Sequence, residues 1–81
     1  MSQERFDDAI ATYQKALKIN PNSAEVHAFL GEVFLLKGRA EQALPLLEKA
    51  QKLDKNEPPT AGALARSLLQ AYNDGILPPK R

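Results

Sequence analysis

Apolar residues recur at steps of three and four positions along most of the chain, which is the period of an amphipathic α-helix. Turn-forming residues separate four such stripes, at positions 20–22, 37–38, 56–59 and 73–75. The stripes are Phe6, Ala9, Ile10, Tyr13, Ala16 and Leu17; Val26, Leu30, Val33 and Phe34; Ala40, Ala43, Leu44, Leu47, Ala50 and Leu53; and Ala61, Leu64, Ala65, Leu68 and Tyr72. No segment alternates as a strand does. The pattern predicts an all-α protein of about four helices, joined by loops so short that consecutive helices run antiparallel.

Three local features refine the predicted helices. Asn22 is a suitable N-cap for the second helix, with Glu25 three residues later to complete a capping box. Pro58 or Pro59 suits the first turn of the fourth helix, where a missing amide costs nothing. Pro45 lies inside the third helix, and we expect a bend there and no break, because the apolar spacing continues unchanged through it.

Composition narrows the possible functions. Eighty-one residues, 43% of them hydrophobic, suffice for one domain, residues 1–81. The 11 Lys and Arg against 10 Asp and Glu give a net charge of +1, so we expect neither a nucleic-acid nor a membrane partner. No cysteine is present and His27 is the one histidine, so we expect no catalytic, metal or cofactor site. No secretory signal or spanning segment is recognisable, which favours a cytoplasmic protein.

The chain repeats itself at a period of 34 residues. Of the 19 pairs from Arg5 with Arg39 to Ser23 with Glu57, six are identical, whereas average residue usage gives on the order of one. The identical pairs are Arg5 and Arg39, Ala9 and Ala43, Lys15 and Lys49, Ala16 and Ala50, Lys18 and Lys52, and Asn22 and Asn56. Continuing the comparison pairs Leu30 with Leu64, although fewer positions then match.

A 34-residue period built from two antiparallel helices resembles the tetratricopeptide repeat. The family's Leu-Gly pair in helix A corresponds to Leu30 and Gly31, and its small residues in helix B to Ala43 and Ala50. Small residues there let two helix axes approach closely. His27 stands where the family most often has tryptophan, and we expect it to be a half-buried ring.

The resemblance implies a right-handed superhelical stack of helix hairpins with a particular division of the chain. Residues 3–22 correspond to helix B of a first repeat and 23–57 to a complete repeat. Residues 58–73 correspond to helix A of a degenerate repeat, and 74–81 form a flexible tail.

In this family a concave groove lined by the A helices holds extended peptides. The corresponding positions here are Glu25, Ala28, Glu32, Leu35 and Leu36 on the second helix, and Pro59, Gly62, Arg66, Leu69 and Gln70 on the fourth. Family members that grip acidic C-terminal tails carry a lysine and an asparagine where this chain has Ala28 and Glu32, so the resemblance disfavours such a clamp.

Within this groove the resemblance implies a role for each kind of residue. We expect Leu35 and Leu69 to offer apolar contact, while the small Ala28 and Gly62 leave room for a ligand backbone. The alternative is that the leucines pack only on each other. Glu32 shares its repeat position with Arg66 on the other A helix, so we expect these two side chains to face each other.

The resemblance therefore implies a non-catalytic module that binds a protein or peptide partner. The alternative is a structural segment that oligomerises or spaces a larger protein. The stripes of the first and fourth helices favour the alternative in one respect, because apolar faces at the ends of a helical stack promote a homodimer.

Overall fold

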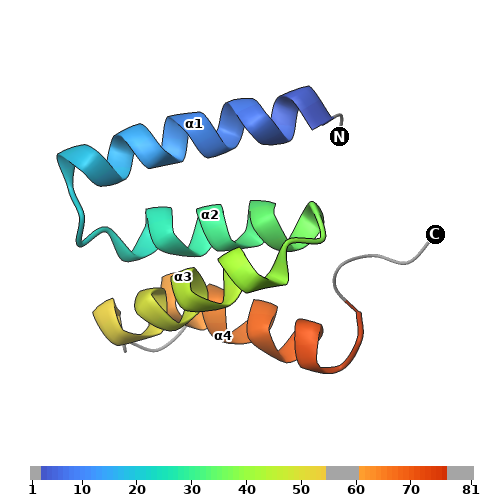
Figure 1. Ribbon diagram of the computed structural model, residues 1–81. Coiled ribbons are helices and arrows are strands. Elements are labelled where there is room, and N and C mark those ends of the chain that lie inside the picture. The colour runs from blue at the N-terminus through green and yellow to red at the C-terminus, as the bar shows by residue number, and fades with distance from the viewer. Residues whose placement is uncertain (1–2, 55–60, 77–81) are drawn as a thin grey trace.

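The computed structural model describes residues 3–54 and 61–76, and these residues form four α-helices. α1 spans Gln3–Ile19, α2 spans Ala24–Leu36, α3 spans Ala40–Leu53 and α4 spans Ala61–Asn73. Consecutive helices run antiparallel, with α1 on one side of α2 and both α3 and α4 on the other (Figure 1). The described part of the chain contains no strand, so the all-α fold is confirmed. The right-handed twist of the stack and the repeat boundaries stay predictions.

The N-cap of α2 is Ser23, one residue later than predicted. The Ser23 hydroxyl accepts a hydrogen bond from the Val26 amide at 3.2 Å, which satisfies one of the free donors in the first helical turn. Asn22 instead belongs to the preceding turn, where its amide donates to the side-chain oxygen of Asn20. With the cap at Ser23, the third helical position is Val26, so the predicted capping box with Glu25 does not form.

A tight glycine turn connects α2 to α3. Gly38 has a φ of 79°, a left-handed conformation that costs glycine little. The amide of Arg39 donates to the carbonyl of Phe34 at 2.8 Å, which closes the last turn of the helix in a Schellman motif. The helix ends here as the turn residues predicted, and α3 folds back along α2.

α3 continues without interruption through Pro45, as its apolar spacing predicted. The side chain of Pro45 is exposed, so the proline ring does not occupy space in the core. The predicted bend stays a prediction. Pro58 and Pro59, proposed for the first turn of α4, lie outside the described residues.

The core lies between α2, α3 and α4. Its buried residues are Ala28, Leu30, Phe34 and Leu35 on α2, Ala43, Leu47 and Ala50 on α3, and Ala61, Ala65 and Leu68 on α4. At the crossing of α2 and α3, a Cβ atom on Gly31 would lie 2.6 Å from a methyl carbon of Leu47. Ala43 and Ala50 are completely buried, which agrees with the close helix approach that their small size predicted.

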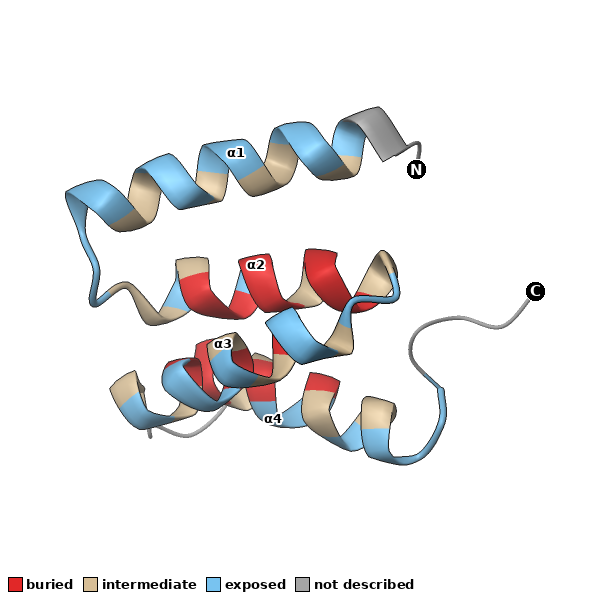
Figure 2. Cartoon of the chain, viewed as in Figure 1, coloured by how far each residue is buried: buried red, intermediate tan, exposed pale blue. Residues whose placement is uncertain are grey.

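α2 is the central helix, and it is apolar on most of its circumference. It contacts α1, α3 and α4, and Figure 2 shows most of it as buried. His27 also lies in this buried part: the residue is 8% exposed, and its Nδ1 lies 2.7 Å from the carbonyl oxygen of Ser23. The ring is therefore more deeply buried than the half-buried site that we predicted for it.

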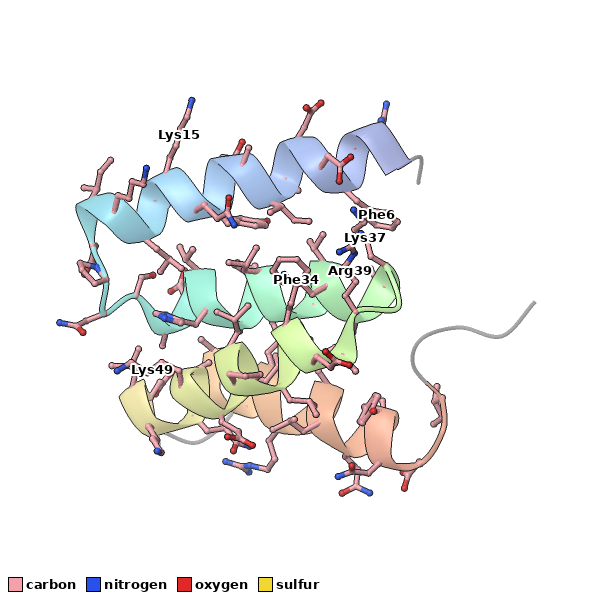
Figure 3. The ribbon with its side chains drawn as sticks, viewed as in Figure 1. Phe6, Lys15, Phe34, Lys37, Arg39 and Lys49 are labelled. Atoms are coloured by element: carbon pink, nitrogen blue, oxygen red, sulfur yellow. The ribbon has the colours of Figure 1, made fainter. Side chains whose placement is uncertain are left out.

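α1 is attached to the rest of the molecule along one side. Among the described helices it contacts α2 alone, and none of its described residues from Arg5 onward is buried. Ile10, Tyr13 and Leu17 pack partly against the core. Asp7 also forms an ion pair with Lys37, with 2.6 Å between the carboxylate oxygen and Nζ. Phe6 and Lys37 accordingly lie at the same end of the α1–α2 pair (Figure 3).

Candidate peptide-binding groove

The predicted groove residues lie on α2 and α4, two helices that are far apart in sequence and pack against each other. Of these residues, Glu25, Arg66 and Gln70 are exposed, and Glu32, Leu36 and Leu69 are half-buried. Pro59 lies outside the described residues. These six side chains can therefore reach a ligand on the surface.

The other three predicted groove residues are not on the surface, which corrects the assignment made from the sequence. Ala28 and Leu35 are 0% exposed and belong to the core. Gly62 is buried where α4 meets the end of α3: a Cβ atom there would lie 1.8 Å from the carbonyl oxygen of Asp54. Leu35 therefore offers no contact to a ligand, and Gly62 makes room for the chain's own backbone. Leu69 packs partly against the same core, as the alternative reading of the leucines expected.

An aromatic side chain that the sequence analysis did not assign lies among the exposed residues of α2. Phe29 is 37% exposed, and its ring stacks on Tyr13 of α1 with centroids 6.0 Å apart and an interplanar angle of 24°. Positions i, i+4, i+7 and i+11 of a helix share one face, so Glu25, Phe29, Glu32 and Leu36 form one line along α2, which we call the α2 stripe. That spacing is visible in the sequence, and it could have identified Phe29.

The carboxylates of the α2 stripe have no partner among the described residues. Neither Glu25 nor Glu32 forms a side-chain hydrogen bond or an ion pair with any residue that the structure describes. In particular, no ion pair joins Glu32 to Arg66, although the two residues were expected to face each other. The stripe therefore presents two free negative charges beside an exposed aromatic ring.

α4 carries a shallow depression that includes two of the predicted groove residues. It has a volume of about 440 Å³ and is lined by Arg66, Ser67, Gln70, Ala71, Asp74 and Ile76. The Gln70 side-chain amide donates to the Asp74 carboxylate at 3.0 Å, which holds both side chains on the rim. Ile76 is 64% exposed. The depression thus combines a cation, a carboxylate, an amide and an apolar residue, and Arg66 and Gln70 among them were predicted from the sequence.

A second depression, of about 450 Å³, lies outside the predicted groove. Its lining consists of residues 38–42 at the start of α3 together with Tyr72 of α4. Tyr72 therefore faces the start of α3 across this depression. In residues 3–54 and 61–76 no group of three or more His, Cys, Asp or Glu side chains is placed to hold a metal ion.

The comparison with known families agrees with the repeat pattern and the helical stack. The family model described as the tetratricopeptide repeat matches residues 1–68. The chain belongs to the tetratricopeptide repeat family. Tetratricopeptide repeats generally mediate protein–protein interactions and are typically non-catalytic. Neither the curated proteins nor the solved structures provide a match. Among the described tetratricopeptide repeat helices, none combines the length and the apolar character needed to cross a membrane.

Proposed function

We propose that this tetratricopeptide repeat chain is a non-catalytic interaction module of the cytoplasm that binds a peptide or partner segment along α2 and α4. The observation that carries the proposal is that these two helices contact each other. Each of them also carries a row of exposed or half-buried side chains at its predicted groove positions. Polar and charged side chains alternate with apolar ones in both rows, as in surfaces that bind an extended chain. The residues beneath these rows belong to the buried core, and a surface that is already in place before binding loses less entropy on binding.

Chemical-shift mapping tests this proposal. Pools of synthetic peptides are titrated into isotope-labelled protein, and the amide signals are followed. We expect saturable shifts at Phe29, Glu32, Arg66 and Leu69. Lys15 serves as an internal control, because its side chain points away from α2 (Figure 3). Shifts confined to α1 or α3, or no saturable shift with any pool, would contradict the groove.

The alternative function, assembly of the chain into a homodimer through its end helices, is favoured by apolar side chains that stay accessible at both ends of the stack. α1 contacts α2 alone among the described helices, and Ile19 at its end is 87% exposed. Tyr72 of α4 is half-buried and Ile76 is exposed at the other end of the stack. A two-fold dimer that joins two α1 ends would bury Ile19, and one that joins two α4 ends would bury Tyr72 and Ile76.

Sedimentation equilibrium tests the dimer directly. We expect the dimer to show an average mass that rises above 8.9 kDa as the protein concentration increases from micromolar to millimolar. A single species of 8.9 kDa throughout would exclude the homodimer and leave peptide binding as the function to be examined.

A further inference from the structure

We propose that the α2 stripe binds a basic segment of a partner protein, in which an apolar residue lies between two lysine or arginine residues. This inference rests on the proposed function and names the chemistry of the partner. The reason is the order of residues along the stripe: a carboxylate at Glu25, an aromatic ring at Phe29, a carboxylate at Glu32 and an aliphatic side chain at Leu36.

The two carboxylates favour positive charges at a defined spacing. Glu25 and Glu32 are seven residues apart on a continuous helix, which separates them by about 10.5 Å along its axis. Neither makes an ion pair with the described part of the chain, so a cation of the partner would replace water and no existing contact. Two cationic side chains of one short segment can span this distance, since each has a long and flexible stem.

The aromatic pair between the carboxylates supplies the apolar contact. The ring of Phe29 is 37% exposed and is held by stacking on Tyr13, so it is already ordered before a partner arrives. Exposed aromatic side chains that are fixed in this way contribute strongly to binding. The ring face also attracts a cation or the aliphatic part of a lysine or arginine side chain.

The positive charges near the stripe do not cancel its acidity. Lys37 follows Leu36 directly, but its side chain is 10% exposed and is paired with Asp7 at 2.6 Å. On α4, Arg66 occupies the position that corresponds to Glu32, and it makes no ion pair with a described residue. Arg66 would weakly repel a basic segment, which gives the experiment a variant that should bind more tightly.

Fluorescence anisotropy with three matched peptides tests the inference. The probe is a labelled synthetic peptide with a leucine between two lysines, and the comparison peptides carry glutamine or glutamate in place of both lysines. We expect the lysine peptide to bind most tightly and the glutamate peptide most weakly. Salt should weaken binding of the lysine peptide alone, because counterions screen exposed charges over a Debye length of about 10 Å at 0.1 M salt.

Variants of the stripe identify the residues involved. Glu25→Gln and Glu32→Gln should each weaken binding of the lysine peptide by about 2- to 5-fold, the range for exposed ion pairs. Glu48→Gln on α3 removes the same charge from an exposed position outside the stripe and should leave binding unchanged. Arg66→Gln should strengthen binding of the lysine peptide.

Two further variants test the inference in different ways. Phe29→Ala should weaken binding by about 30-fold or more, as expected for an interface hot spot, with thermal unfolding measured alongside. If Phe29→Ala unfolds the protein, the double variant Glu25→Lys/Glu32→Lys still tests the inference, because it should reverse the preference from the lysine to the glutamate peptide.

The outcomes separate this inference from the proposed function. Equal binding of all three peptides, or an equal loss in Glu48→Gln and Glu32→Gln, would overturn the basic partner while leaving peptide binding in place. Tighter binding of the glutamate peptide by the unmodified protein would also overturn it. If none of the three peptides binds, the basic partner is overturned, and the proposed function fails as well only if the peptide pools also give no saturable shift.

Discussion

α1 and α3 carry related residues at positions 34 apart, yet they are buried to different extents. Ala43 and Ala50 of α3 are 0% exposed, whereas their counterparts Ala9 and Ala16 of α1 are half-buried. α3 lies against both α2 and α4, while α1 contacts α2 alone among the described helices. The same apolar stripe therefore becomes core in one helix and partly exposed surface in the other. The burial of an apolar stripe is therefore set by the helices that pack against it, and not by the residues of the stripe alone.

The largest expected difference concerns the central residue of each stripe. Leu47→Ala should lower the free energy of unfolding by about 2–5 kcal/mol, because it opens a cavity at a fully buried site. Tyr13→Ala changes the corresponding residue of α1, and it should cost less, since Tyr13 is half-buried and its stacking on Phe29 contributes about 0.5–1.5 kcal/mol. Urea unfolding followed by circular dichroism measures both. If both variants lost the same free energy of unfolding, α1 would be as firmly packed as α3.

A second pair of variants replaces a small side chain with a larger one at matching positions of α3 and α1. Ala50→Leu should cost about 1–3 kcal/mol, because the site has no space for a larger side chain. Ala16→Leu makes the identical change at the matching position of α1 and should alter stability by within about 0.5 kcal/mol, as at other surface sites. The denaturant midpoints of the two variants are compared. An unchanged midpoint for Ala50→Leu would contradict the close helix approach that the repeat alignment assigns to this position.

The smallest expected effect concerns the attachment of α1. Asp7→Asn removes the ion pair with Lys37 and should cost at most about 1 kcal/mol, since Asp7 is 63% exposed and the pair is screened by water. Asp8→Asn is the matched control: it makes the same charge change at an adjacent exposed position.

Amide hydrogen exchange provides the readout for this attachment. We expect amides of α1 to exchange faster than those of α3 in the unmodified protein, because α1 has fewer buried contacts. Asp7→Asn should increase that difference, whereas Asp8→Asn should not. Equal exchange in both variants would show that the ion pair contributes nothing to holding α1 on α2.

The helices and their ends were predicted with small errors of known cause. The turn at Gly38 was found because its left-handed backbone calls for glycine. The cap of α2 is Ser23 and not the predicted Asn22, because both residue types cap helices and the sequence pattern does not show at which of the two neighbouring residues the helix begins. In the structure the Ser23 hydroxyl accepts from the Val26 amide, and the backbone amide of Asn22 belongs to the preceding turn.

The repeat pattern predicted part of the candidate site correctly. Glu25, Glu32 and Arg66 are accessible as expected, but Leu35 is buried beneath them. Periodicity places a leucine on a helix face and does not show how far the neighbouring helix covers that face. Phe29 was not predicted as a site residue, because it stacks on Tyr13 of another helix. The apolar spacing within one helix does not show such a contact between two helices.

The sequence by itself determined four helices, their turns, their antiparallel order and their membership of a 34-residue repeat. These features depend on apolar spacing and on glycine, proline and asparagine at turns, all of which act over a few neighbouring residues. Only the tertiary structure decided which apolar positions are core and which remain on the surface. That outcome depends on the helices packed against each face, so matching alanines in α1 and α3 are buried to different extents. For the same reason the α2 stripe keeps two carboxylates, without a partner among the described residues, beside an exposed ring.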